Sequence, residues 1–374
     1  MKKHPNYSLL FLIIFIISFS FLFLACLSAS LSMQNRGNIY YFLLHQVLFG
    51  LLPGVALGLV AYMISLNFLK KWAPALVFVN ILALFAVFIP GIGIRAGGAT
   101  RWLNLGFTSI QPAEFLKITA IIYLSAWIAS KLSDSDEKSW KSAGKKSYHN
   151  VIYILAPFMV LLGLILIGLI LQRDLSTLGI IGATLLALYF SAKTPFWHTI
   201  TLVALGATAF LIFIRFEQYR VDRFFTFLNP DHDPMGKGLQ LKQSMLALGS
   251  GGFFGKGLGM SAQKFFLPES MTDSIFAIIG EELGIIGCLI IVISFILLFW
   301  MGIKMAKDSK DRFSQILAIG IVFYLTFQAL INMSSVVGIF PLAGIPLPLF
   351  SYGGSHLVVE LIALGLLLNI SKNT

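Results

Sequence analysis

Charged side chains are scarce in this 374-residue chain: Asp, Glu, Lys and Arg make up 11% of it, against 57% hydrophobic residues. A soluble domain cannot hide so much apolar surface in its core, so the composition excludes that class and indicates a protein of the lipid bilayer. Acidic residues are rarer than basic ones, 16 against 27. The excess cations lie mostly in short loops without exposed aromatics, which predicts contact with membrane lipid and no nucleic acid binding.

Cysteine is nearly absent as well, with two residues in the chain. Cys26 and Cys288 fall inside hydrophobic runs, so we interpret them as packing residues and not as a disulfide. His and Cys show no metal-ligand spacing. Ser351 and Ser355 have no base and carboxylate arranged near them, and His356 fits a helix cap or a packing residue, so nucleophilic catalysis is discounted.

The chain is rich in long hydrophobic runs. Ten of them are candidates to cross a bilayer as helices: residues 8–31, 40–66, 74–90, 112–130, 151–171, 175–192, 196–215, 275–302, 313–334 and 355–370. We therefore predict an all-α polytopic membrane protein with ten transmembrane helices, forming a single domain over residues 1–374. Lysines gather in alternate loops, which places both termini in the cytoplasm.

One polar segment, residues 216–274, interrupts these runs between predicted helices 7 and 8. With cytoplasmic termini it is a large extracytoplasmic loop, and it ends in Asp273 where the next span begins. An Asp at this point can cap the helix. Because a carboxylate beside hydrocarbon holds a proton more tightly than in water, Asp273 can equally act as a general base near neutral pH. The residues alone leave both interpretations open.

Further ionisable groups stand at membrane depth on the same outer side. Glu114 and Lys117 are three residues apart on a helix that begins near Pro112, so they share one face and can neutralise each other. A structural ion pair and a substrate-facing pair are both compatible with this spacing. Arg101 and Asp174 are the other ionisable groups that the sequence places at membrane depth on the outer side.

A glycine-rich stretch at residues 249–259 lacks the residue pattern of a phosphate-binding P-loop. Its backbone can still approach a ligand closely. Three lysines could then face an anionic group such as a pyrophosphate: Lys242, Lys256 and Lys264. A flexible turn without any ligand is the alternative.

Two carboxylates, Glu281 and Glu282, lie about two turns into the helix that follows the loop. An unpaired charge is costly there, so we expect partners for both, and Lys117 is one candidate. Near the C-terminus, prolines and glycines at residues 344–355 predict an outer loop that shapes a rim. Two residues of this loop are assigned supporting roles: Ser351 and Gly353.

At these motifs the chain resembles the SEDS family of bacterial cell-wall polymerases, to which FtsW, RodA and SpoVE belong. The motifs that carry the likeness are residues 101–106, 111–114, 229–236, 249–259, 272–273, 280–284, 344–348 and 351–355. Residues 90–93, Pro-Gly-Ile-Gly, are closer to the FtsW branch than to the RodA branch.

The resemblance implies an enzyme of the bacterial cytoplasmic membrane that polymerises lipid II into glycan strands on the outer face. It implies a divalent cation, Mg²⁺ or Mn²⁺, and no organic cofactor. The implied partners are a class B penicillin-binding transpeptidase and proteins of the division or elongation complex. Asp273 matches the family's essential outer-loop aspartate, and four residues match polar positions of its central cavity: Arg101, Glu114, Lys117 and Asp174.

As a hypothesis on this basis, Asp273 removes the proton from the 4-hydroxyl of the acceptor sugar, and direct displacement inverts the donor anomeric carbon. Two departures from the family stand out. Arg173 replaces a proline between Gln172 and Asp174, so the turn that proline would fix is not expected here, and His356 stands where serine is common. Two other functions are open, a lipid II flippase and a non-catalytic scaffold of the division or elongation machinery.

Overall fold

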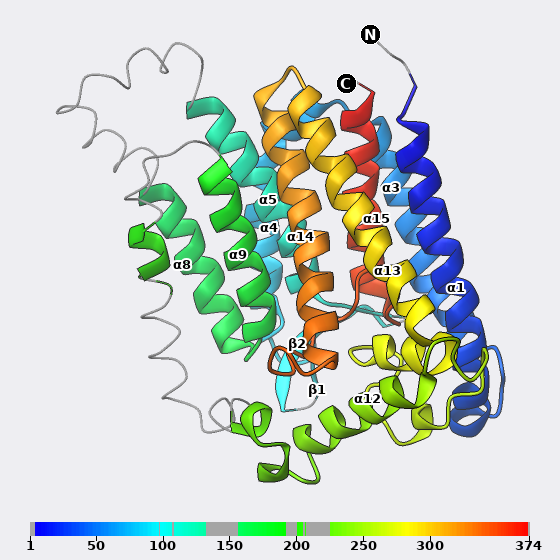
Figure 1. Ribbon diagram of the computed structural model, residues 1–374. Coiled ribbons are helices and arrows are strands. Elements are labelled where there is room, and N and C mark those ends of the chain that lie inside the picture. The colour runs from blue at the N-terminus through cyan, green and yellow to red at the C-terminus, as the bar shows by residue number, and fades with distance from the viewer. Residues whose placement is uncertain are drawn as a thin grey trace.

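The computed structural model describes residues 4–96, 98–106, 108–131, 156–191, 200–204, 206 and 225–372. Most of its helices run side by side as one bundle, and a layer of loops with helix α12 (Lys237–Gly251) lies across one end (Figure 1). Both chain ends lie at the opposite end of the bundle. There the backbone N–H of Asn6 donates to Oγ of Ser371 at 3.0 Å, so the two termini share one side.

Seven helical units in the described part of the chain are long and apolar enough to cross a membrane: α1 (Tyr7–Arg36), the unit of α2, η1 and α3 (Tyr41–Met63), α4 (Leu66–Ala86), α5 (Pro112–Lys131), α13 (Ile275–Asp308), α14 (Arg312–Val336) and α15 (Gly354–Ser371). Two shorter apolar helices are α8 (Ala156–Leu171) and α9 (Leu175–Ser191). Together they cover every predicted span except residues 196–215, most of which lie outside the described residues. The count of ten helices therefore stays a prediction.

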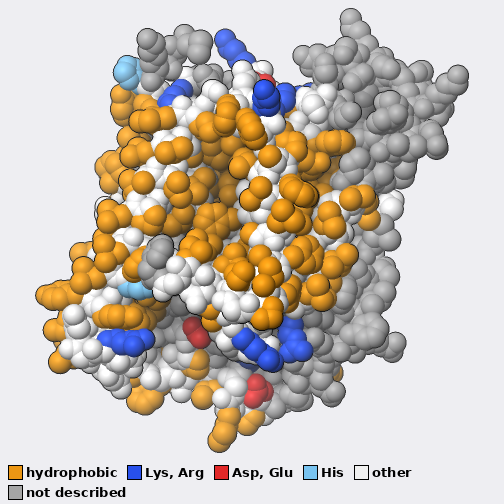
Figure 2. Space-filling model, turned by 180° about the vertical axis from the view of Figure 1, so that it is seen from behind, with side chains coloured by type: hydrophobic (Ala, Val, Ile, Leu, Met, Phe, Trp, Pro, Cys, Tyr) orange, Lys and Arg blue, Asp and Glu red, His pale blue; other side chains and the backbone are white. Residues whose placement is uncertain are grey.

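The surface between the two ends of the bundle is hydrophobic. Figure 2 shows a broad band of apolar side chains between two rims that carry the Lys, Arg, Asp and Glu side chains. Large apolar side chains on these helices are exposed, among them Phe11 on α1 at 73% and Val79 on α4 at 63%. Such a belt is unstable in water and matches the hydrocarbon of a bilayer, while helices keep their backbone groups bonded inside it. The chain is a multi-pass membrane protein.

Glycines let α3 and α15 pack closely. A Cβ built on Gly58 would lie 2.8 Å from the carbonyl oxygen of Leu361, and one on Gly365 would lie 2.2 Å from the carbonyl oxygen of Gly58. Any larger side chain would therefore push the helices apart. Small residues serve this purpose in membranes because lipid tails compete with every apolar contact, and close backbone packing adds dispersion contacts.

The fold is not entirely helical, which corrects the all-α prediction. An antiparallel sheet of order β1 (Gly93–Ala96), β2 (Ala99–Asn104), β3 (Ser109–Ile110) follows α4, with Ile94 opposite Trp102 and Leu103 opposite Ile110. Its strands are too short to show a clear alternation in the sequence. The predicted loop 216–274 is also partly ordered into helix, with α12, η4 (Pro230–His232) and η5 (Gln263–Phe265).

Candidate active site at the membrane edge

Asp273 lies in the turn that leads into α13, at the end of the bundle away from the termini. Its side chain is half-buried. The capping position of α13 falls on Ser274, which makes no side-chain capping hydrogen bond. The capping interpretation therefore places the helix start one residue too early.

The backbone on both sides of Asp273 is held from α14 and from the loop that follows it. Nδ2 of Asn332 donates to the carbonyl oxygens of Asp273 at 2.8 Å and Ile345 at 2.7 Å. Oγ of Ser351 donates to the carbonyl of Thr272 at 2.6 Å. Ser351 is 1% exposed. Two buried side chains thus fix adjacent peptide units, so the position of the carboxylate is preorganised.

Helix α12 and a tight turn hold the same segment from other directions. Nε2 of Gln240 donates to Oγ of Ser274 at 2.9 Å, and that hydroxyl donates to the carbonyl of Pro268 at 3.2 Å. Glu269 has a positive φ of 53° and its carbonyl accepts from the backbone N–H groups of Thr272 and Ser274. Its exposed carboxylate also accepts from Oγ1 of Thr272 at 2.7 Å. Glu269 stands four residues before Asp273, and no role for it was predicted from the sequence.

Glu114 and Lys117 form the predicted ion pair, and it is fully enclosed. Nζ of Lys117 lies 2.8 and 2.9 Å from the two carboxylate oxygens of Glu114 and 2.9 Å from Oε1 of Gln328 on α14. Glu114 and Lys117 are 4% and 2% exposed. Nε2 of Gln328 donates in turn to the carbonyl of Pro346 at 3.0 Å. The pair therefore joins α5 and α14 to the outer loop. The candidate contact from Lys117 to the carboxylates of α13 is wrong.

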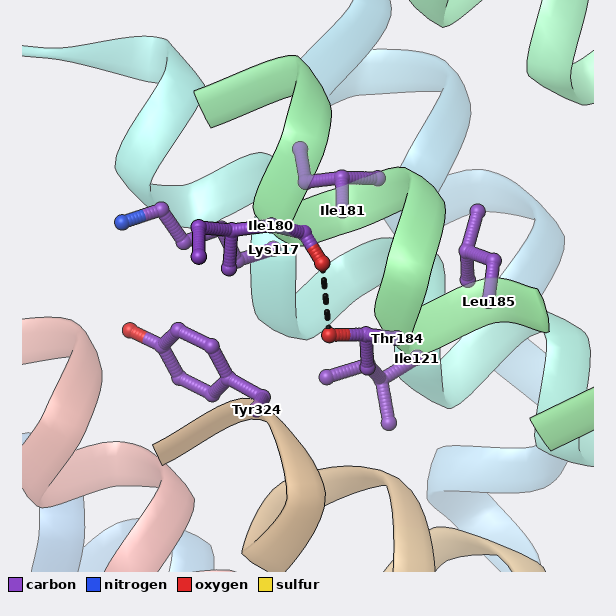
Figure 3. Close-up of a pocket in the computed structure, with 7 residues that line it drawn as sticks. All are labelled: Lys117, Ile121, Ile180, Ile181, Thr184, Leu185 and Tyr324. Atoms are coloured by element: carbon purple, nitrogen blue, oxygen red, sulfur yellow. Dashed lines mark hydrogen bonds between the residues drawn. The ribbon is translucent and has the colours of Figure 1, made fainter. Parts of the chain in front are cut away.

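A small hollow adjoins this pair between α5, α9 and α14. It has about 160 Å³ of empty space and no room for a water-sized sphere. In Figure 3 the ammonium of Lys117 and the hydroxyl of Tyr324 point to the same side, while Ile180, Ile181 and Leu185 line the apolar part. This hollow between α5, α9 and α14 is therefore too narrow for a ligand in this conformation.

Glu360 is a buried acid that sequence reasoning missed. It is 0% exposed on α15. Its Oε2 accepts from the backbone N–H of Leu349 at 2.7 Å, and Leu349 has a positive φ of 67°. Its Oε1 has no hydrogen-bond partner among the residues that the structure describes. The available signal was a single acidic residue within a hydrophobic run, which is a functional or structural marker in any membrane protein.

Asp174 begins α9. Its Oδ1 accepts from the backbone N–H of Thr177 at 3.2 Å and its Oδ2 from the hydroxyl of Thr177 at 2.9 Å, the pattern of a helix N-cap. Arg101 on β2 donates from Nε to the carbonyl of Gln172 at 3.1 Å and from Nη2 to that of Arg173. Arg173 has φ of 56°, which proline cannot adopt, so the departure from the family's proline does change this turn.

The glycine-rich stretch is anchored to a break in α13. Gly284 has φ of 67° inside the helix, and a Cβ there would lie 2.5 Å from the backbone nitrogen of Gly255. The backbone N–H groups of Lys256 and Gly257 donate to the carbonyls of Glu281 and Glu282 at 2.9 and 3.0 Å. In this conformation the stretch is bonded to α13, and its contact with a ligand stays a prediction.

The carboxylates of Glu281 and Glu282 accept hydrogen bonds from the segment that contains and follows the glycine-rich stretch. Glu281 pairs with Nζ of Lys256 at 2.7 Å and accepts from the backbone N–H of Gln263 at 3.2 Å. Glu282 accepts from the backbone N–H groups of Gly259 at 2.9 Å and Ser261 at 3.2 Å. Both acids are 0% exposed. They bind the loop to the helix across about twenty residues of sequence.

The three lysines predicted to face an anion differ in availability. Lys264 is 4% exposed and its Nζ donates to the carbonyl of Gly259 at 2.7 Å, so it faces the loop interior and the prediction is wrong for it in this conformation. The side chains of Lys242 and Lys256 are 47% and 38% exposed, and each pairs with a carboxylate, Lys242 with Asp231. Of the three predicted lysines, Lys242 and Lys256 are therefore the ones exposed enough to reach a ligand.

The rim predicted near the C-terminus is held by the second span. The backbone N–H of Gly353 donates to Oε1 of Gln46 at 2.8 Å. The hydroxyl of Tyr352 lies 2.9 Å from Nδ1 of His45, and the backbone N–H of Tyr352 donates to the carbonyl of Met271 at 2.7 Å. Burial, with a smaller contribution from Tyr41, raises the pKa of Tyr352 to about 12. The rim and the Asp273 turn therefore form one hydrogen-bonded unit.

A protein-only metal cage is not formed by the residues that the structure describes, because no three His, Cys, Asp or Glu side chains gather among them. Mg²⁺ in other proteins is often held by one or two carboxylates together with substrate phosphates. The divalent cation stays a prediction.

Fold and site define a class: a helical multi-pass membrane protein with the half-buried Asp273 carboxylate on a hydrogen-bonded turn at one end of the bundle. The chain belongs to the FtsW/RodA/SpoVE family, described as cell cycle protein, which it matches over residues 7–374. It is 38% identical to the "Probable peptidoglycan glycosyltransferase FtsW" of Trichlorobacter lovleyi, over 97% of this chain and 92% of that one. It is 33% identical to stage V sporulation protein E of Bacillus subtilis, over 99% and 98%.

Solved structures share the fold over nearly the whole chain. A chain from "Structural coordination of polymerization and crosslinking by a peptidoglycan synthase complex" aligns with a TM-score of 0.76 and 23% identity, covering 98% of this chain and 97% of that one. The rod shape determining protein RodA of Thermus thermophilus aligns with a TM-score of 0.69, covering 98% and 96%. Several relatives at 36–38% identity are named FtsW, which supports the FtsW-like branch and the bacterial inner membrane.

Proposed function

We propose that the protein is a peptidoglycan glycosyltransferase that polymerises lipid II into glycan strands at the outer face of the cytoplasmic membrane. The observation that carries the proposal is the half-buried Asp273, whose backbone is fixed by Asn332 and whose neighbour Thr272 is fixed by Ser351. The turn lies at the end of the bundle away from the termini, which is the outer side if the termini are cytoplasmic. The relatives named as peptidoglycan glycosyltransferases support the same reaction.

In the proposed reaction the Asp273 carboxylate accepts the proton of the acceptor sugar's 4-hydroxyl. The electron pair left on that oxygen forms a bond to the donor anomeric carbon. At the same time the bond from this carbon to the undecaprenyl pyrophosphate breaks, and the pyrophosphate leaves with the bonding electrons. Direct displacement inverts the configuration at that carbon. The backbone contacts of Asn332 and Ser351 keep the base in position, which a proton transfer over hydrogen-bond distance requires.

The leaving pyrophosphate gains negative charge, and positioned cations stabilise such charge. Lys242 and Lys256 are the exposed lysines of the outer layer that we assign to this role. Each would leave a carboxylate partner, so binding of the pyrophosphate would exchange one ion pair for another. Mg²⁺ or Mn²⁺ shared between Asp273 and the substrate would add charge stabilisation.

The buried polar residues have supporting roles in this proposal. The pair of Glu114 and Lys117, with Gln328, connects the bundle core to the outer loop. Arg101 and Asp174 hold the turn between α8 and α9. Their contact with substrate, which the family resemblance implies, would require this region to open.

We further propose that the protein works with a class B penicillin-binding transpeptidase in a division or elongation complex. The likeness to FtsW relatives favours division. The partner's docking surface is not assigned.

Lipid II translocation is the competing function, and the region beside Lys117 offers it no path in this conformation. A head-group path needs polar space across the membrane, whereas the hollow beside Lys117 admits no water-sized sphere. The test is reconstitution of the purified protein in vesicles with labelled lipid II. We expect glycan strands on one face without transfer of head groups. Head-group transfer without chain growth would contradict the proposal.

A further inference from the structure

A separate groove lies between α4 and α5, far along both helices from the Asp273 turn. It encloses about 380 Å³, the size of a small-molecule site. Its polar and aromatic walls are Asn67, Lys70 and Lys71 from α4 and Tyr123, Trp127 and Ser130 from α5. Helix α4 begins at Leu66 and α5 ends at Lys131, so the groove opens at the end of the bundle that carries the termini.

Two neighbouring cations give the groove its charge. The ion pairs found in the described part of the chain involve neither Lys70 nor Lys71. Lys70 is half-buried and Lys71 is exposed, and both line the same space. Within the described residues neither lysine has a carboxylate partner, so the two cations attract an anion. The hydroxyl of Ser130 and the amide of Asn67 line the same groove.

The depth of the groove matches the head-group region of a bilayer. Lys70 stands four residues after the start of α4, which is about 6 Å along the helix. Tyr123 and Trp127 stack with ring centroids 6.2 Å apart, and such rings favour the membrane interface. Further along α4, Phe78 and Val79 are 61% and 63% exposed in the apolar belt. A ligand with an anionic head group and acyl chains fits the charged groove and the apolar surface of α4 that continues from it.

We propose that this groove binds the phosphate head group of an anionic phospholipid such as phosphatidylglycerol. The phosphate lies between Lys70 and Lys71, the glycerol beside Tyr123 and Trp127, and the acyl chains along the apolar side of α4. This site is independent of the glycosyltransferase proposal, since it needs only the membrane embedding of the bundle.

The test is native mass spectrometry of the full-length protein released from nanodiscs that contain equal amounts of phosphatidylglycerol and phosphatidylcholine. The wild type should retain phosphatidylglycerol selectively. Lys70→Gln with Lys71→Gln should weaken its binding about thirtyfold, because each cation near a membrane surface contributes about 1 kcal/mol, or about fivefold in affinity. The matched control is Lys307→Gln with Lys310→Gln, two exposed lysines at the same end of the bundle and outside the groove.

A second variant keeps the charge and fills the space: Ser130→Trp should lose the lipid although both lysines remain. Equal retention by the groove and control variants would overturn the proposal, as would equal retention of phosphatidylcholine by the wild type. Displacement of the lipid by millimolar glycerol phosphate alone would show a site for a soluble phosphate and would also overturn it. Selective loss in both groove variants supports it.

Discussion

The two carboxylate regions of the outer layer use their acids in opposite ways. Around the break in α13, Glu281 and Glu282 are completely buried and their oxygens are occupied by the glycine-rich loop. Two residues before α13, the hydrogen bonds fix the backbone of Asp273 while its side chain stays half-exposed. A buried acid with many donors holds a fold together, whereas an acid on a pinned backbone at the surface can meet a substrate. Under the proposed function, this difference in burial and bonding distinguishes the structural acids Glu281 and Glu282 from the catalytic acid Asp273.

Removal of one of the two buried acids, Glu281 or Glu282, should have the largest effect on stability. Glu281→Ala removes the acceptor of several backbone and side-chain donors at once, so we expect the free energy of unfolding to fall by about 3 kcal/mol or more. Thermal unfolding in detergent measures it. Asp308→Ala, an exposed acid near the end of the same helix, should change stability by less than about 0.5 kcal/mol. A similar loss in both variants would contradict the structural role.

Gly284→Ala tests the helix break that receives the loop. The positive φ alone costs a residue with a Cβ about 1–2 kcal/mol, and the contact with the backbone of Gly255 adds to it. Gly163→Ala on α8 is the control, since a Cβ there meets nothing within 4 Å. We expect a lower midpoint of thermal unfolding for the first variant only. An unchanged midpoint in Gly284→Ala would show that the loop anchor can relax.

Asn332→Ala tests whether the hydrogen bonds to the backbone of Asp273 support the proposed catalysis. Without its amide, the carbonyls of Asp273 and Ile345 lose a buried donor and the base loses its fixed position. We expect kcat for lipid II polymerisation to fall about tenfold with KM little changed. Thr326→Ala is the control on α14, because its hydroxyl bonds only to its own helix. A change confined to KM would assign Asn332 to substrate binding instead.

The smallest expected effect concerns the rim. The folded-state pKa of Tyr352 is about 12, above the ordinary value of 10.0, so the neutral phenol stabilises the fold. That contribution is complete below pH 10 and is lost as the pH rises toward 12. Tyr352→Phe should flatten the fall in stability within this window, which thermal unfolding between pH 9 and pH 12 measures. An unchanged slope would mean that the phenol is solvated.

The sequence predicted what depends on local spacing. Hydrophobic runs located the described spans, and a separation of three residues was sufficient for the pair of Glu114 and Lys117. The third partner of Lys117, Gln328, lies 211 residues away and could not be found by spacing. The partners of Glu281 and Glu282 depend on a loop that folds back onto a broken helix, and the short strands depend on register. These contacts are tertiary, so a single sequence does not reveal them.

The most direct test of the central claim is polymerisation of purified lipid II by Asp273→Asn. The substitution keeps the size and the backbone contacts and removes the base, so chain growth should fall about 10²–10⁴-fold with an unchanged midpoint of thermal unfolding. Glu269→Gln, an exposed acid of the same turn, should polymerise like the wild type. Chain growth by Asp273→Asn at the wild-type rate would contradict the account.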